Sequence, residues 1–206
     1  NLTRTQQSET LGESFCVLFG IADEERAAKV ISTMPVGEFG PPIFSPQIVS
    51  QPDYHNNGVW PYVTSFWGKA AAKVGNETAL MHALACNVRT ASIYATNYEN
   101  YSFNTGNPYT TQINSPNMLW GLSGFMGLFH RTFFGLEFTK EGLALKPFVP
   151  TVLAGTRKLE AFPYRGMKLD ITVSGSGNEI ASCLVDGKEA EAFAAADWTG
   201  KHRIEM

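Results

Sequence analysis

The chain has 206 residues, of which 44% are hydrophobic, enough to form a core in one or two domains. Charged residues make up 17%, the net charge is −3, and no run of lysine or arginine is present that would neutralise phosphates. The composition therefore argues against nucleic acid as a partner. No apolar stretch reaches the roughly 20 residues that cross a bilayer, so we expect no membrane partner.

Metal-binding residues are few and scattered. The chain has three cysteines and four histidines, and none of them follows the spacing of a metal site. Cys16 and Cys86 lie among apolar residues on predicted helices, which is typical of buried free thiols. We therefore expect no metal and no cofactor.

Apolar periodicity predicts helices over residues 7–20 and 22–34, and Pro35 ends the second. Residues 35–58, here called the first loop, then lack any period and contain five prolines. A loop of this length is uncommon inside a compact domain and is usually functional or disordered. Because it also holds several aromatic and aliphatic residues, we expect an ordered loop lying across a site.

The pattern then returns to helices, over residues 60–74 and 77–96. A second aperiodic stretch, residues 97–114, is rich in Asn, Thr and Tyr and is here called the second loop. A last helix is predicted over residues 116–134. It is apolar on nearly every face, which predicts burial on all sides.

From Gly135 onward the sequence is typical of strands. Polar and apolar residues alternate over 167–173, and Asp186-Gly187 is a hairpin signal. We therefore expect two domains, residues 1–135 with helices and residues 136–206 forming a small antiparallel β-sandwich-like unit.

The two loops carry residues of the kinds that sugar-binding sites use. Aromatic rings offer flat apolar faces to sugar rings, and planar amides bind hydroxyl groups. Residues of these kinds are Tyr54, His55, Asn56, Trp60, Tyr98, Asn100, Tyr101 and Asn104. Their mixture predicts an oligosaccharide or glycoside as the substrate.

A glycoside hydrolase also needs two carboxyl groups, one as an acid and one to activate water or attack the sugar. Glu99 is the only acidic residue between Glu77 and Glu137, and tyrosines and amides that could orient a water surround it. It is the candidate catalytic residue. The structural alternative is an acidic loop residue that caps a backbone turn.

The other acidic residues are weaker candidates. Asp53 follows a proline and precedes a polar run, which is ordinary for a turn residue. Glu9 and Glu13 lie one helical turn apart and share a face. A carboxylate pair is one interpretation of that face, and a solvated helix surface is the favoured one.

Two segments, Tyr54 to Pro61 and Glu99 to Gly106, resemble motifs of the six-hairpin glycosidases, and Asn114-Ser115 leads into a helix similar to the family's last one. The relevant members are glycoside hydrolase family 63 and bacterial glycogen-debranching-like enzymes, and the resemblance covers about residues 7–150. It implies a mainly α fold class, a partial (α/α)6 toroid followed by the β unit.

The resemblance also implies an inverting hydrolase for an α-linked glucoside or related oligosaccharide, with Glu99 as general base. Tyr54, His55, Asn56, Trp60 and Tyr101 would then line the sugar subsite. The family's general acid, an aspartate on an earlier loop, has no match here, and five helices are fewer than a toroid's twelve.

An upstream part of the same polypeptide is therefore expected to be missing, which leaves open whether this chain is active alone. Relatives of this kind are often exported by bacteria, so the expected location is periplasmic or secreted.

Two alternatives stay open. One is another six-hairpin enzyme, an α-L-rhamnosidase or a disaccharide phosphorylase. A phosphorylase needs a phosphate site, yet the nearest basic residue upstream of Glu99 is Arg89. The other is a non-catalytic sugar-binding module that kept the fold and lost the acid.

Overall fold

The computed structural model describes residues 6–206 and divides into two compact units. The first unit is helical and ends at Leu128, and the second unit is Phe129–Met206. The division falls inside the stretch predicted as the last helix. Each unit has its own core.

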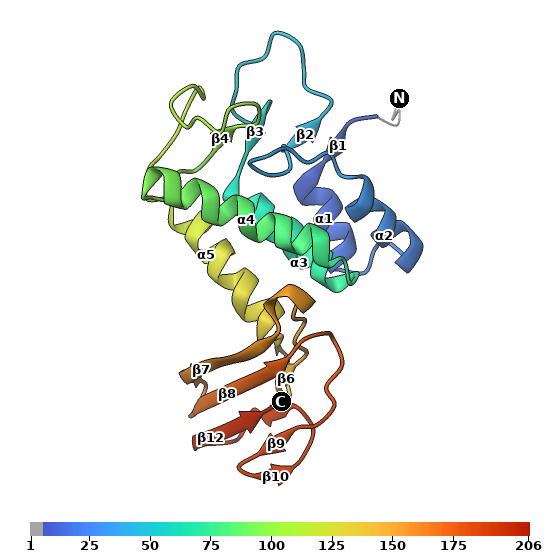
Figure 1. The fold of residues 1–206 in the computed structure, drawn as a ribbon, viewed down its shortest axis with the longest axis vertical. Coiled ribbons are helices and arrows are strands. Elements are labelled where there is room, and N and C mark those ends of the chain that lie inside the picture. Colours follow the sequence, from blue (N-terminus) through green and yellow to red (C-terminus); the bar gives the residue numbers. More distant parts are fainter. Residues whose placement is uncertain (1–5) are drawn as a thin grey trace. The chain divides into compact units, whose positions relative to one another are not determined.

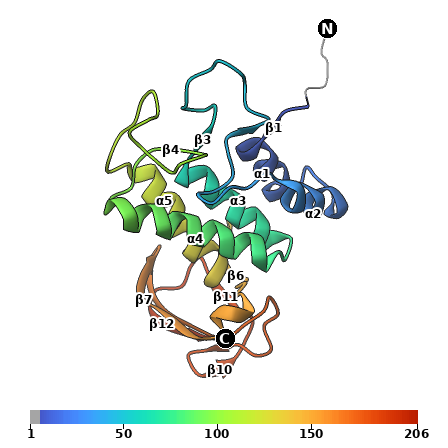
Figure 2. The same ribbon diagram turned by 45° about the horizontal axis from the view of Figure 1, so that its top comes forward.

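The first unit contains five α-helices within the described part of the chain. They are α1 (Thr10–Leu18), α2 (Glu24–Thr33), α3 (Pro61–Lys73), α4 (Glu77–Tyr94) and α5 (Leu119–Leu128). Helix α3 lies at the centre, since it packs against α1, α4 and α5 (Figure 2). At its contact with α4 and α5, a Cβ on Gly68 would lie 2.9 Å from that of Ala83. The absence of a side chain at Gly68 thus allows close helix packing.

Side chains near the helix starts explain where two of the helices begin. Asp23 accepts a hydrogen bond from the backbone N–H of Arg26 at 2.8 Å, and Asn76 accepts one from Ala79 at 3.0 Å. These contacts satisfy backbone donors that a helix leaves free in its first turn. Both helices therefore begin close to the positions that the sequence predicts.

Helix α5 differs from its prediction in length and in burial. Asn117 has a φ of 59°, a left-handed conformation that an α-helix does not accommodate, so the helix begins at Leu119. It ends at Leu128, where a π-helical turn, Phe129–Phe133, follows. The expected burial on all sides is wrong, because α5 packs against α3 through one face and leaves Leu119 77% exposed. No helix among residues 6–206 combines the length and apolar character needed to cross a bilayer.

The two loops lie at the same end of the helices (Figure 1). Strand β3 (Gly58–Val59) follows the first loop and pairs antiparallel with β4 (Tyr101–Ser102) in the second loop. Strand β1 (Ser8–Glu9) pairs in the same way with β2 (Phe44–Ser45) inside the first loop. The first loop is therefore anchored in its middle and at its end.

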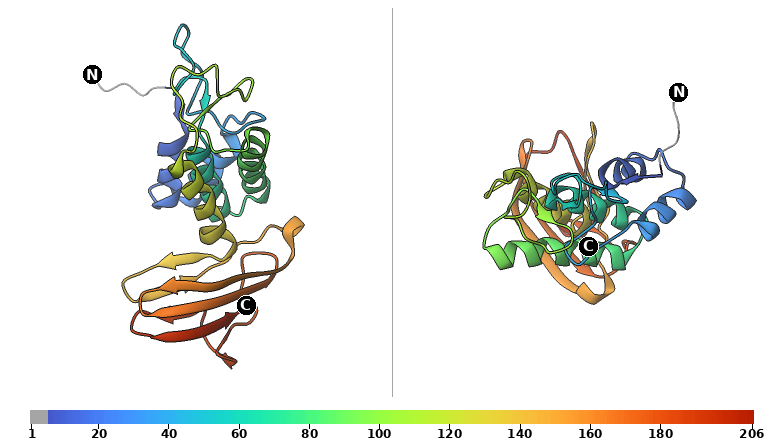
Figure 3. Two further views of the ribbon diagram at one scale, coloured as in Figure 1. Left: turned by 90° about the vertical axis from the view of Figure 1, so that its left-hand side faces the viewer. Right: turned by 90° about the horizontal axis from the view of Figure 1, so that it is seen from above.

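The second unit consists of two packed sheets (Figure 3). Its strands are β5 (Leu136–Phe138), β6 (Gly142–Leu145), β7 (Gly155–Tyr164), β8 (Met167–Gly175), β9 (Leu184–Val185), β10 (Lys188–Glu189), β11 (Phe193–Ala195) and β12 (Gly200–Glu205). One sheet has the order β10-β9-β12-β8-β7 and the other β11-β6-β5. The predicted alternation over 167–173 is confirmed: Leu169 and Ile171 are buried in the core, and Lys168 and Asp170 are exposed. Strand β12 runs parallel to β8, so the larger sheet is mixed.

The expected fold class, mainly α with a partial (α/α)6 toroid, is wrong. The structure is 34% helix and 25% strand, with five helices and four sheets in the described residues, a mixed α and β fold. The helices are shorter than predicted because capping residues and residues with a left-handed backbone limit them at their ends. The loops add short strands. The recognition of a six-hairpin glycosidase is wrong with it. Its motifs lie in loops, and loop chemistry does not determine the fold that carries it.

Candidate functional site

The paired strands β3 and β4 bring the two loops into direct contact. The backbone N–H of Phe103 donates to the carbonyl of Asn57 at 2.7 Å, and that of Gln112 donates to the carbonyl of Asp53 at 2.7 Å. These bonds join residues far apart in sequence. Residues of both predicted sugar-binding segments therefore lie in one place.

Asp53 holds this arrangement together from the first loop. Its Oδ2 accepts hydrogen bonds from Asn57 Nδ2 at 2.9 Å and from Ser102 Oγ at 3.1 Å. Asn57 and Ser102 are both buried, so this carboxylate satisfies two donors that water does not reach freely. The contacts support the turn-residue interpretation of Asp53.

Aromatic rings cluster beside the paired strands. His55 stacks on Trp60 with ring centroids 4.9 Å apart, and Tyr54 lies 4.5 Å from His55 and 5.2 Å from Trp60. Trp60 is buried and its Nε1 donates to the carbonyl of Tyr54 at 3.0 Å. Trp60 thus fixes the positions of the half-buried Tyr54 and the exposed His55.

Two further rings, Tyr62 and Trp120, join this cluster and were not expected from the sequence as site residues. Tyr62 stacks on Trp120 with centroids 4.9 Å apart, and Trp120 contacts Trp60 edge-on at 5.3 Å. Tyr54, His55, Trp60, Tyr62 and Trp120 are called the aromatic wall below. The small residues of α5 indicate that this helix packs closely on α3. A Cβ on Gly124 would lie 3.3 Å from Ser65 of α3, and the two helices carry Trp120 and Tyr62.

Glu99 lies two residues before Tyr101, which pairs with Val59 directly before Trp60 of the aromatic wall. Its backbone N–H donates to the carbonyl of Ser115 at 2.9 Å, which fixes the residue, and its side chain is half-buried. Within residues 6–206 its carboxylate makes no hydrogen bond and no ion pair with another side chain. The pKa of Tyr54 is raised, first by burial and second by the negative charge of Glu99.

The predicted sugar ligands Asn56 and Asn100 instead have amides bound within the loops. Asn56 Oδ1 accepts from the backbone N–H of Ile48 at 2.7 Å, and its Nδ2 donates to the Ile48 carbonyl at 3.2 Å. Asn100 is fully buried, and its Nδ2 donates to the carbonyl of Ile113 at 3.0 Å. Both side chains thus hold loop backbone in place.

A group of four tyrosines, called the tyrosine cluster, is formed by the last residue of helix α4 and three residues of the second loop. Its members are Tyr94, Tyr98, Tyr101 and Tyr109. Tyr101, a predicted sugar contact, is fully buried, whereas Tyr98 is half-buried and Tyr109 exposed. Tyr98 Oη donates to Tyr109 Oη at 3.2 Å, and this bond is the first cause of a raised pKa at Tyr98.

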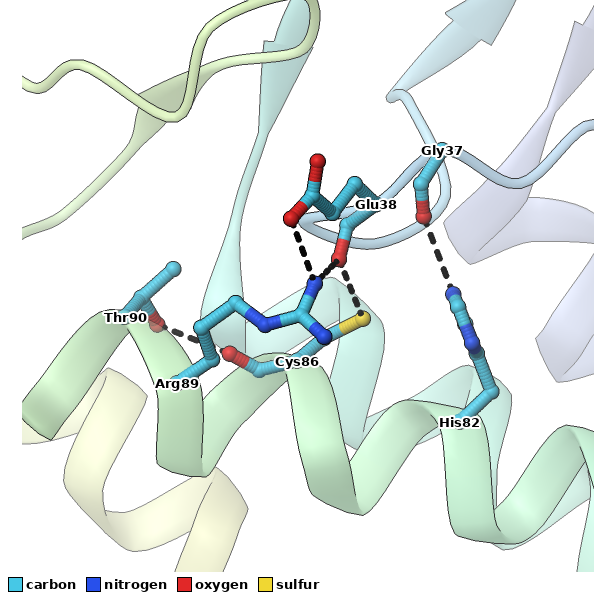
Figure 4. Close-up of polar contacts among 6 residues, drawn as sticks. All are labelled: Gly37, Glu38, His82, Cys86, Arg89 and Thr90. Carbon is cyan, nitrogen blue, oxygen red and sulfur yellow. Dashed lines mark hydrogen bonds and ion pairs between the residues drawn. The ribbon is translucent and has the colours of Figure 1, made fainter.

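The first loop is also fastened to helix α4 (Figure 4). His82 Nε2 lies 2.9 Å from the Gly37 carbonyl, Cys86 Sγ donates to the Glu38 carbonyl at 3.4 Å, and Arg89 Nη1 donates to the same carbonyl at 2.6 Å. Burial raises the pKa of Cys86 to about 12, so this thiol is structural. In the described part of the chain, no group of three or more His, Cys, Asp or Glu residues is arranged to hold a metal ion.

Comparison with known proteins adds no family. No family model matches the chain, and no curated protein matches it. The resemblance of the two loop segments to six-hairpin enzymes therefore has no support beyond those segments. What the site does has to follow from its own geometry.

Proposed function

We propose that the paired loops bind an oligosaccharide and that Glu99 acts there as the general base of a glycoside hydrolase. The observation that carries the proposal is an unpaired, half-buried carboxylate on a loop that is strand-paired to the segment leading into a wall of aromatic rings. An acidic residue that capped a turn would have its oxygens on backbone N–H groups, as Asp23 does. The Glu99 carboxylate instead has free acceptors.

The aromatic wall supports the choice of a sugar as ligand. Sugar rings have apolar faces that pack on aromatic side chains, and sugar hydroxyl groups need polar partners beside those rings. Tyr54 presents both a ring and a hydroxyl, and His55 adds ring nitrogens. The site therefore combines the two kinds of surface that a neutral, polyhydroxylated ligand needs.

The mechanism assigns Glu99 the task of activating water. Its carboxylate takes a proton from a water molecule, whose oxygen attacks the anomeric carbon as the glycosidic bond breaks. The activated water attacks the anomeric carbon from the face opposite the leaving group, so the product has the inverted configuration. The leaving oxygen takes its proton from a general acid. Asp53, already bound to Asn57 and Ser102, is not that acid.

A second candidate function is a sugar-binding module without catalysis. The observation that favours it is that the two loops hold one free carboxylate, Glu99, whereas hydrolysis uses two. Wild-type behaviour separates the two functions, because a module binds sugar and leaves it intact.

The test uses the full chain with a panel of disaccharides and oligosaccharides, with α-linked glucosides first. Binding is measured by calorimetry and turnover by released sugar. We expect Glu99→Gln to lower turnover about 10²- to 10⁴-fold while sugar affinity is kept. Glu160→Gln, a change at an exposed acid of the second unit, is the matched control and should leave both values unchanged.

Each outcome is informative. If the wild type binds sugar without turnover, the result supports the sugar-binding module and contradicts the hydrolase function. Near-normal turnover in Glu99→Gln would show that Glu99 is not the general base. If the wild type binds no sugar, the whole proposal is overturned. Proton NMR of the first-formed product tests the mechanism, since a retained anomer contradicts the water-activating role.

A further inference from the structure

Tyr109 combines high exposure with a fixed position. Its side chain is 72% exposed, yet its ring contacts Tyr98 with centroids 5.7 Å apart and Tyr94 at 6.1 Å, both nearly perpendicular. Its hydroxyl also accepts a hydrogen bond from Tyr98 Oη at 3.2 Å. An exposed ring without such contacts would rotate freely. Tyr109 therefore presents apolar surface to solvent in one defined orientation.

The backbone that carries Tyr109 is held as well. Asn107 Oδ1 accepts from the Tyr109 N–H at 2.8 Å, and Asn114 Nδ2 donates to the Pro108 carbonyl at 2.8 Å. Tyr94 Oη of helix α4 donates to the Gly106 carbonyl at 3.0 Å. A surface that is ordered before binding loses little conformational entropy when a ligand covers it.

The tyrosine pair lies next to Glu99. Tyr98 and Glu99 are consecutive, so their Cα atoms are about 3.8 Å apart. The Tyr98 ring contacts Tyr101 and Tyr109 of the tyrosine cluster. On the other side of Glu99 in the sequence, Tyr101 pairs with Val59, directly before Trp60 of the aromatic wall. Glu99 therefore lies in the chain between the residues that lead to the two aromatic groups.

The surroundings of the pair favour a neutral ligand. The sequence holds no Asp, Glu, Lys or Arg between Glu99 and Arg131. Thr110 and the two tyrosine hydroxyl groups give polar groups at the edge of the rings. A charged peptide or a phosphate would have no countercharge from this segment.

We propose that Tyr98 and Tyr109 form a second sugar subsite, so that the site binds a disaccharide or a longer chain across Glu99. The inference rests on the proposed sugar-binding function and adds a substrate length to it. One sugar ring packs on the aromatic wall and the next on the tyrosine pair. The bond between two such units then lies by the Glu99 carboxylate.

The test compares the dissociation constants of the full chain for a monosaccharide and for the di- and trisaccharide of the same sugar. We expect Tyr109→Ala to weaken binding of the longer sugars roughly tenfold and to leave the monosaccharide unchanged. Tyr109→Phe keeps the ring and should keep most of the affinity. Phe19→Ala is the matched control, because Phe19 is also 72% exposed and lies at the C-terminal end of α1, outside both loops.

The inference is overturned by equal effects of Tyr109→Ala on short and long sugars, or by an equal effect of Phe19→Ala. It is also overturned by unchanged affinity for the trisaccharide. These results leave the proposed function standing if the wild type still binds sugar. Failure of the wild type to bind any sugar is a different result, and it contradicts both the second subsite and the proposed function.

Thermal unfolding confirms that each variant is folded. Tyr98→Phe is a second variant that removes the hydroxyl contact alone.

Discussion

Ser102 donates a hydrogen bond through its Oγ to Asp53 Oδ2 at 3.1 Å, across 49 positions in the sequence. Ser102 is buried in strand β4, and Asp53 lies in the first loop. The same Oδ2 accepts from Asn57 Nδ2 of the first loop, so one oxygen connects residues of both loops. This junction helps to hold the loop that carries Glu99 beside the loop that carries Tyr54.

Removal of the junction should destabilise the helical unit. Asp53→Ala leaves the Ser102 hydroxyl and the Asn57 amide buried without an acceptor, which costs about 1–3 kcal/mol. Ser102→Ala alone should cost less, because the Asp53 carboxylate keeps Asn57 as a donor. Denaturant unfolding followed by tryptophan fluorescence measures both, since Trp60, Trp67 and Trp120 all report on this unit.

The double variant completes a thermodynamic cycle. We expect a coupling energy of about 0.5–3 kcal/mol between Asp53 and Ser102, the range for residues in one hydrogen-bond network. Additive effects would show that the two loops are held by their backbone bonds alone.

A second prediction concerns Gly58, where a side chain has no room. A Cβ there would lie 1.7 Å from the carbonyl oxygen of Tyr54, the atom that accepts the hydrogen bond from Trp60 Nε1. Gly58→Ala must displace that carbonyl, so we expect about 1–3 kcal/mol of destabilisation and weaker sugar binding. The measurements are denaturant midpoint and sugar affinity.

Gly121→Ala in helix α5 is the matched control. Its Cβ would meet Pro61 at 3.7 Å, an ordinary contact, and alanine favours a helix interior over glycine by up to about 1 kcal/mol. It should be neutral or stabilising. Equal midpoints for Gly58→Ala and the wild type would contradict the close packing at β3.

The sequence predicted local structure better than it predicted the site. Pro61 starts α3 because its fixed φ suits the first helical position, and Asn76 caps α4 by accepting from the Ala79 N–H, so a local pattern suffices. Asn56 and Asn100 looked like ligands because their amides are polar and lie beside aromatic residues. Their partners are backbone groups of loop residues 8 and 13 positions away, which no spacing rule identifies.

The fold class failed for a related reason. Strand β12 lies between β8 and β9 and runs parallel to β8, with Ile204 opposite Ile171. Alternation of polar and apolar residues indicates that a segment is a strand and leaves its neighbour undetermined. The family motifs have the same weakness, since they describe two loops and not the number of helices around them.

A third prediction concerns pH and the second unit. Asp186 Oδ1 accepts from the Arg203 N–H at 2.8 Å, and Oδ2 contacts His202 Nδ1 at 2.8 Å. These bonds, the one from Arg203 first, lower the pKa of Asp186 below 3.8. A lowered pKa in the folded state stabilises the protein above the unfolded-state value, and this contribution is lost as pH falls through the lowered pKa.

The measurement is the melting temperature of the wild type and of Asp186→Asn between about pH 2 and pH 6. We expect the wild type to be more stable at the upper end and the difference to shrink once the pH drops below 3.8. Asp197→Asn, a change at an exposed acid of the same unit, should show no such trend. A constant difference across the range would mean that the Asp186 charge does not contribute.

The last prediction concerns the thiol under the first loop. Burial raises the pKa of Cys86 to about 12, and its Sγ donates to the Glu38 carbonyl at 3.4 Å. At about pH 8 the thiol therefore stays protonated and unreactive. Alkylation with iodoacetamide, followed peptide by peptide in a mass spectrometer, should therefore label half-buried Cys16 before Cys86.

Arg89→Met tests whether the loop itself protects the thiol. The change removes the bond from Arg89 to the Glu38 carbonyl and the 3.3 Å ion pair with the Glu38 carboxylate. We expect faster labelling of Cys86 and an unchanged rate at Cys183, which is buried in the second unit. Labelling of Cys86 as fast as Cys16 in the wild type would show that the first loop opens readily. The anchored loop on which the proposed sugar site depends would then be contradicted, because a loop that leaves α4 does not hold Tyr54 and His55 in place.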